Sequence, residues 1–98
     1  MKQIDIFYLT YCPYCINARK AVNELKEEKP AYREIEIRWI EESEEAELAN
    51  NRDYYYVPTI FFGERKLYEA KPGDNYARIK ENVRNAFEAV AALGKKPD

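Results

Sequence analysis

Cys12 and Cys15 are the only cysteines in this chain of 98 residues, and two residues separate them. They follow a mainly apolar run, residues 4–9, and precede a helical pattern that begins at Ile16. If a helix begins here, Cys12 is its N-cap and Pro13 its first residue, where proline loses no hydrogen bond. The free backbone N–H groups and the helix dipole then favour a thiolate on Cys12, the reactive form of cysteine. Cys15 lies one turn along the same face, so the pair can alternate between dithiol and disulfide.

Other uses of two cysteines are weaker interpretations. A structural disulfide between them would close a very short loop and constrain the unfolded chain little. A zinc site needs about four ligands, and the chain has no histidine and no third cysteine. Two chains could still share a metal through Cys12 and Cys15 of each. Without histidine, proton transfer at the site falls to a cysteine, a carboxylate, a lysine, a tyrosine or water.

Composition limits the class of protein. The length predicts one domain, residues 1–98. The net charge of −2 and the lack of a basic stripe argue against nucleic-acid binding. No segment approaches the roughly twenty apolar residues that cross a membrane, and the N-terminus has no signal-peptide pattern. We expect a cytoplasmic monomer whose cysteine pair is catalytic.

Hydrophobic periodicity predicts seven elements in the order β-α-β-α-β-β-α. Their expected ranges are residues 2–9, 13–29, 32–39, 41–51, 59–62, 66–69 and 75–93. The alternation in residues 32–39 fits a strand at a sheet edge. Gly63 suits a type II′ turn between the fifth and sixth elements. Asp74 is the expected N-cap of the last helix, which Gly94 and Pro97 end.

Two clusters leave alternatives open. Glutamates crowd the predicted helix 41–51, where they form either a solvated face or a docking patch for a basic partner. Ala46, Leu48 and Ala49 are its expected contacts with the sheet. Three tyrosines, residues 54–56, run into Val57 and form either an aromatic wall beside a substrate groove or packing at a strand entrance.

The sequence Cys12-Pro13-Tyr14-Cys15 resembles the active-site motif of the glutaredoxins, a branch of the thioredoxin superfamily. Val57-Pro58-Thr59 opens a later apolar strand, about where that superfamily carries its cis-proline. The resemblance extends over residues 2–93 in element order and length. It implies an α/β thioredoxin fold with a four-stranded mixed sheet flanked by helices. It also implies that the two segments meet at one end of the sheet.

The resemblance further implies thiol–disulfide exchange. Cys12 attacks a substrate disulfide, and Cys15 resolves the mixed disulfide. Val57 offers its backbone to the substrate as an added strand, and Tyr11, Pro58, Thr59 and Asp74 complete the expected substrate-binding set. No bound cofactor or metal is expected. The implied partners are disulfide-containing proteins or glutathione mixed disulfides, with glutathione as a candidate co-substrate and a reductase as a candidate electron donor.

Departures from the family pattern concern glutathione. Leu9 stands where the family has a lysine that pairs with the glycine carboxylate of glutathione. Residues 67–70 stand where a Gly-Gly pair cradles the γ-glutamyl end, and Gly73-Asp74 follows only after a short insertion. Ile6 stands where thioredoxins carry a buried aspartate. We expect a general oxidoreductase with weak glutathione binding. The alternatives are a thioredoxin-like reductase fed by a flavoprotein reductase and a non-catalytic or metal-sharing interaction module.

Overall fold

The computed structural model describes residues 2–94. The predicted order of elements is confirmed, with one 3-10 helix, η1, added between the first helix and the second strand. The elements are β1 (Gln3–Tyr8), α1 (Pro13–Glu28), η1 (Pro30–Glu34), β2 (Glu36–Glu41), α2 (Ala46–Asn50), β3 (Thr59–Phe62), β4 (Arg65–Glu69) and α3 (Tyr76–Gly94).

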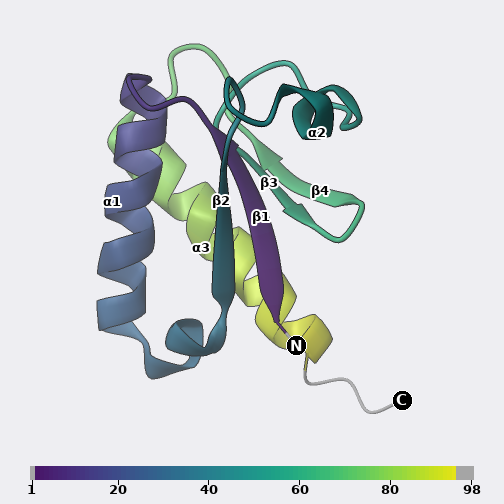
Figure 1. Ribbon diagram of the computed structural model, residues 1–98. Helices are drawn as coiled ribbons and strands as arrows, with labels where there is room; N and C mark the ends of the chain where they lie inside the picture. Colours follow the sequence, from purple (N-terminus) through teal and green to yellow (C-terminus); the bar gives the residue numbers. More distant parts are fainter. Residues whose placement is uncertain (1, 95–98) are drawn as a thin grey trace.

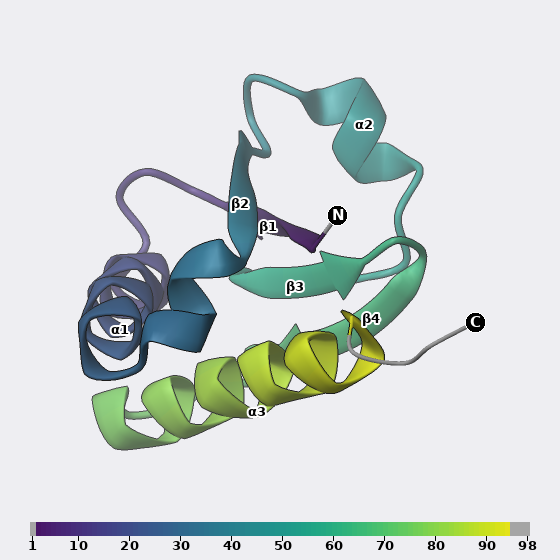
Figure 2. The same ribbon diagram turned by 90° about the horizontal axis from the view of Figure 1, so that it is seen from below.

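The four strands form one mixed sheet in the order β2-β1-β3-β4. β1 runs parallel to β2 and antiparallel to β3, and β3 pairs with β4 as a hairpin. Helices α1 and α3 cover one face of the sheet, and α2 lies over the other (Figures 1 and 2). This arrangement is the predicted α/β thioredoxin fold, with the second strand at an edge.

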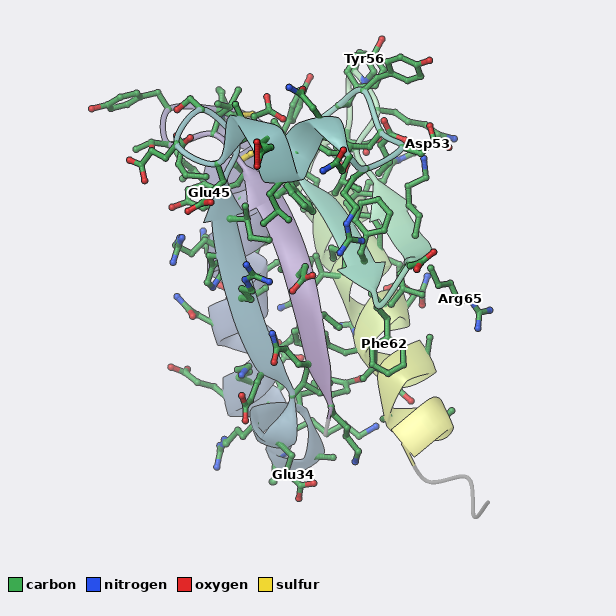
Figure 3. All side chains as sticks on the ribbon, turned by 45° about the vertical axis from the view of Figure 1, so that its right-hand side comes forward. Glu34, Glu45, Asp53, Tyr56, Phe62 and Arg65 are labelled. Atoms are coloured by element: carbon green, nitrogen blue, oxygen red, sulfur yellow. The ribbon has the colours of Figure 1, made fainter. Side chains whose placement is uncertain are left out.

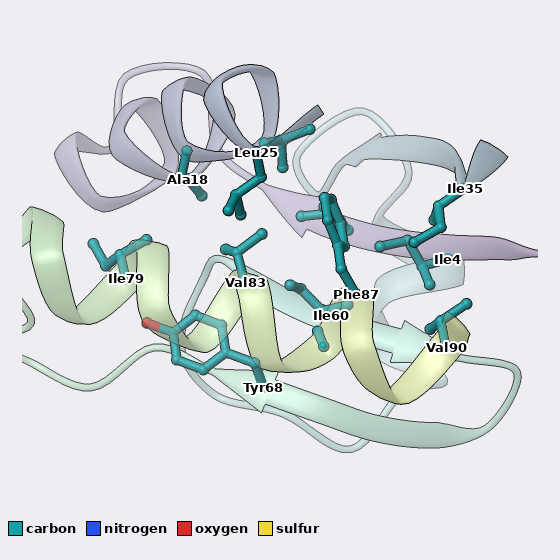
Figure 4. Packing of buried hydrophobic residues seen from close by; sticks show 14 of the residues in the cluster. Ile4, Ala18, Leu25, Ile35, Ile60, Tyr68, Ile79, Val83, Phe87 and Val90 are labelled. Atoms are coloured by element: carbon teal, nitrogen blue, oxygen red, sulfur yellow. The ribbon is translucent and has the colours of Figure 1, made fainter. Parts of the chain in front are cut away.

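The main core lies between α1, α3 and the sheet. Helix α1 buries Ala18, Ala21, Val22 and Leu25, which recur every three or four residues and so share one face. Figure 4 shows Leu25 on the side of α1 that faces Val83 and Phe87 of α3. Burying a side chain of this size stabilises the fold by about 1.5–3 kcal/mol. This packing fixes the start of α1 relative to the carboxyl end of β1.

A smaller core fills the opposite face of the sheet, beneath α2. It consists of Phe7, Ile40, Ala49 and Phe61. β1 therefore carries buried apolar side chains on both faces, as its sequence predicts for a strand covered on both sides.

Two predicted boundaries are wrong because side chains there serve other purposes. The second strand begins at Glu36 and not at Tyr32. Residues Pro30–Glu34 form η1, which places the Tyr32 side chain in the main core, where its hydroxyl donates a hydrogen bond to Glu88. Helix α2 is only five residues long, because residue 41 completes β2 and a turn follows it. Ala46 is exposed, so of the three expected contacts only Leu48 and Ala49 pack against the core.

The start of α3 also differs from expectation. Asn75, and not Asp74, caps this helix, because its side-chain oxygen accepts a hydrogen bond from Arg78 N at 2.8 Å. Gly63 has φ 62° in the β3–β4 turn, in agreement with the predicted turn type. Pro97 lies outside the described residues. Among residues 2–94, no helix combines the length and apolar character that a membrane span requires.

Candidate active site

The cysteine motif lies where β1 ends and α1 begins. Cys12 is the N-cap of α1, with φ −78° and ψ 122°, and Pro13 follows at the first turn. Both placements confirm the sequence prediction. The Cys12 side chain makes no capping hydrogen bond. Its thiol instead donates to Val57 O at 3.8 Å, across 45 positions of the chain. The fold therefore brings the motif to the predicted Val57-Pro58 segment.

The Val57-Pro58 peptide bond is cis, as the family resemblance implies. Pro58 is fully buried, and its carbonyl accepts a hydrogen bond from Ala70 N at 3.0 Å. Within residues 2–94, the Val57 N–H has no hydrogen-bond partner. Thr59 is completely buried, and its hydroxyl donates to Tyr56 O. Val57 thus presents backbone groups beside Cys12, whereas the Thr59 side chain serves the fold.

The two thiols have different surroundings. Both cysteines are free, and Cys12 is partly exposed whereas Cys15 is only 4% exposed. The pKa of Cys15 is raised to about 12, mainly by burial, and the nearby Cys12 and Glu42 contribute in the same direction. The Leu9 N–H, which donates to Cys15 Sγ at 3.5 Å, acts in the opposite direction. Cys12 is the accessible thiol and Cys15 the shielded one.

The residues beside the two cysteines differ in exposure to solvent. Tyr14 is partly buried against the main core, and its hydroxyl accepts a hydrogen bond from Gly73 N at 2.9 Å. This bond joins the motif to the loop before α3. Tyr11 is 92% exposed, and Pro13 is also at the surface. Tyr11 is therefore free to contact a partner, and Tyr14 is engaged with the fold.

Asp74 points inward. It is 8% exposed, and its Oδ2 accepts hydrogen bonds from the Tyr68 hydroxyl at 2.8 Å and from Lys71 N at 3.0 Å. Burial and the Asp74 carboxylate raise the pKa of Tyr68. The expected substrate-binding side chain is thus used to hold the loop before α3.

The glutaredoxin family model matches residues 4–67, which is more than half of the chain. The chain belongs to the glutaredoxin family. Among solved structures, thioredoxin 1 from the thermophilic eubacterium Thermosipho africanus TCF52B is similar, with a TM-score of 0.57 and 15% sequence identity. The alignment covers 89% of this chain and 96% of that one, and at this identity it shows the shared fold alone. A search of curated proteins finds no match.

In this family member, Glu41 is a site residue that sequence reasoning missed. It ends β2 beside Tyr8, the last residue of β1, and is 9% exposed. Its Oε2 accepts from Thr10 N at 3.0 Å and from Thr10 Oγ1 at 2.8 Å. Its Oε1 accepts from Ser43 N at 2.7 Å and from Ser43 Oγ at 2.6 Å. These four bonds, led by the Ser43 hydroxyl, lower the pKa of Glu41 to about 2.

The glutamates that crowd residues 41–47 favour a helix that includes Glu41, which is the wrong prediction for this residue. The strand pattern, continued two residues through Ile40, would have placed Glu41 at the carboxyl end of an edge strand. In a parallel pair, that end lies beside the end of β1 and the cysteine motif.

Two grooves border the active-site loop. The first holds Cys12 and Tyr11 on one side and Glu41, Ser43 and Glu44 on the other, with a volume of about 740 Å³. The second reaches Cys15 from the side of α1. Arg19 lines this second groove, where its guanidinium lies over the Trp39 ring at 4.1 Å from the centroid.

Of the two roles considered for the three consecutive tyrosines, Tyr54 takes the packing role. Tyr54 packs on Phe7 with ring centroids 5.1 Å apart, and its hydroxyl donates to Glu42 at 2.6 Å. Tyr55 and Tyr56 are exposed, at 89% and 52%, next to the Val57-Pro58 segment. Tyr54 is a packing residue, and the other two face solvent.

Proposed function

We propose that this chain is a dithiol oxidoreductase in which Cys12 is the nucleophile and Cys15 the resolving thiol. The observation that carries the proposal is the unequal exposure of the two cysteines in one motif. Cys12 faces a groove and the Val57 backbone, whereas Cys15 is buried behind it. A substrate disulfide can therefore reach Cys12 directly, and Cys15 acts only on Cys12 Sγ, once that sulfur is bonded to the substrate.

The reaction exchanges two electrons. The Cys12 thiolate attacks one sulfur of the substrate disulfide, forms a mixed disulfide and releases the other sulfur as a thiol after protonation. Cys15, as thiolate, then attacks Cys12 Sγ and releases the second substrate sulfur. The protein ends as the Cys12–Cys15 disulfide, and the substrate disulfide ends as two thiols.

Cys15 must lose its proton in the second step. Two of the influences that raise the pKa of Cys15 come from Cys12: a hydrogen bond between the two side chains and the negative charge of Cys12. Both influences change once Cys12 is bonded to the substrate, because its sulfur no longer carries a proton or a charge. The Leu9 N–H then remains to stabilise the Cys15 thiolate. Forming the mixed disulfide thus prepares the resolving thiol.

Backbone groups of Val57 would align the substrate. The Val57 N–H has no partner among residues 2–94, and Val57 O already lies at Cys12. An extended substrate segment can pair with these two groups as an added strand. That pairing would bring the substrate sulfur to Cys12.

We further propose that glutathione is a poor substrate. Leu9 supplies no cation for its glycine carboxylate, and Glu41 and Glu44 line the same groove. At the other end, Asp74 is buried and bonded to Tyr68. Gly73 N is bonded to Tyr14. A charge-assisted hydrogen bond contributes on the order of 1.5–3 kcal/mol, so losing one weakens binding about tenfold or more.

The other expectations stay as parts of this proposal. The protein would act as a cytoplasmic monomer without a bound cofactor, on disulfide-containing proteins. A flavoprotein reductase is the proposed electron donor. Glutathione, the alternative donor, would fit the chain less well for the reasons above.

Steady-state kinetics test the proposed function. We expect the reduced protein to reduce a protein disulfide, such as that of insulin, and to turn over a glutathione mixed disulfide slowly and without saturation. Cys12→Ser should abolish activity, and Cys15→Ser should trap a mixed disulfide. Turnover and saturation with glutathione typical of the family would contradict the glutathione proposal. Activity in Cys12→Ser would contradict the mechanism.

A further inference from the structure

Acidic side chains outnumber basic ones in the segments beside Cys12. Residues 9–18, 39–51 and 53–58 hold the active-site loop, the end of β2 with α2, and the segment before β3, and none of them contains a lysine or an arginine. They contain six carboxylates: Glu41, Glu42, Glu44, Glu45, Glu47 and Asp53. Figure 3 shows Glu45, Asp53 and Tyr56 toward one end of the sheet, with Glu34 at the other.

Two of these carboxylates line the groove that Cys12 lines, Glu41 and Glu44. The negative charge of Glu41 is fixed, because all four of its partners are donors: the N–H and O–H groups of Thr10 and Ser43. The backbone N–H groups of Thr10 and Ser43 donate to different oxygens of Glu41. An ionised carboxylate has two equivalent acceptor oxygens, whereas a protonated acid or an amide does not. Glu44 is exposed and lines the same groove.

The nearby cations do not line this groove. Lys71, in the loop bonded to Tyr14, lines a separate pocket with Asp74 and Arg78. Arg19 lines the other groove, over Trp39. Arg52 binds Asp5 at 3.2 Å and Gly63 O at 2.8 Å, in the direction of the β3–β4 turn. Lys66 pairs with Glu69 at 2.8 Å. The groove beside Cys12 therefore has acidic groups and, among its lining residues, no basic one.

We propose that the groove beside Cys12 selects disulfides that carry a cationic group next to the attacked sulfur, with Glu41 and Glu44 as the residues that determine this specificity. The natural occupant is a polypeptide segment with lysine or arginine beside its cysteine. Opposite charges across an interface speed encounter and disfavour wrong partners. The inference rests on the proposed function, since it concerns the substrate of the same thiol.

Three small symmetrical disulfides test the selection: cystamine, which is cationic, 2-hydroxyethyl disulfide, which is neutral, and 3,3′-dithiodipropionate, which is anionic. Each is mixed with pre-reduced protein, and the single-turnover rate is divided by its rate with dithiothreitol to remove differences in intrinsic reactivity. A unit charge about 4 Å from another in water contributes about 1 kcal/mol, which is about a fivefold change in rate. We expect the order cationic, neutral, anionic, with about fivefold between neighbours at low ionic strength and less in high salt.

Glu44→Gln should reduce the preference, and Glu44→Lys should abolish it, because the lysine charge offsets the remaining charge of Glu41. Glu41→Gln should also reduce it. Glu47→Gln is the matched control, because Glu47 is exposed on α2 and does not line the groove. Equal normalised rates, or an equal effect of Glu44→Gln and Glu47→Gln, would overturn this inference alone. If the protein reduces none of the three disulfides, the proposed function fails as well.

Discussion

The clearest quantitative consequence of the site concerns the reactivity of Cys15. Burial is the main reason that the pKa of Cys15 rises from an ordinary 9.0 to about 12. At pH 8, a thiol with the ordinary value is about one-tenth thiolate, and one with a pKa of about 12 is about one ten-thousandth thiolate. Since only the thiolate is alkylated, folding should slow alkylation of Cys15 about a thousandfold.

Cys12→Ser isolates this thiol, because Cys15 is then the only cysteine. The substitution removes the contributions of Cys12 but leaves the burial, so we expect at least a hundredfold slowing. Iodoacetamide rates at pH 8 are measured for the folded variant and for the same variant in urea. Cys15→Ser provides the comparison, since Cys12 is partly exposed and folding should slow its alkylation far less than that of Cys15.

A folded rate within tenfold of the unfolded rate in Cys12→Ser would refute the reasoning. It would mean that the environment of Cys15 does not hold it as a thiol. The assignment of attacking and resolving roles would then lose its physical basis. A slow Cys12 in Cys15→Ser would contradict it from the other side.

Three further predictions concern the redox potential, Glu41 and Arg19. With Pro-Tyr between the cysteines and Ile6 in place of an aspartate, equilibration against glutathione buffers should give a potential of roughly −200 to −230 mV, and a value near −270 mV would contradict this. The pKa of Glu41 is lowered from 4.5 to about 2, so its carboxylate stabilises the fold above pH 4.5, and that contribution is lost as the pH falls toward 2. In urea titrations, the free energy of unfolding of Glu41→Gln should therefore be lower than that of the wild type at pH 6, and the difference should shrink between pH 4.5 and 2. A difference that stays constant over this range would exclude the linkage. Arg19→Ala should change the fluorescence of Trp39, the only tryptophan, and lower the free energy of unfolding by about 0.5–1 kcal/mol through loss of the stacked guanidinium; unchanged emission would show that the stack is absent in solution.

Local rules predicted much of the fold and the centre of the site from the sequence. The apolar spacing in α1 and Pro30 after it placed that helix to within one residue of its observed end. Gly63 placed the β3–β4 turn. The two-residue spacing of Cys12 and Cys15 after a strand located the redox motif. Each of these signals lies within a few residues of the structure that it specifies.

Tertiary structure decided the features that depend on distant partners. Glu41 obtains two of its four hydrogen bonds from Thr10, 31 positions away, so its helix-forming character was no guide to its role. Tyr32 leaves the strand pattern because the main core and Glu88 of α3 hold it. Asn75 caps α3 in place of Asp74, because the Asp74 carboxylate is buried and accepts a hydrogen bond from the Tyr68 hydroxyl of β4. In each case a side chain found a partner from another element, and a buried polar group is most stable where all its hydrogen bonds are made.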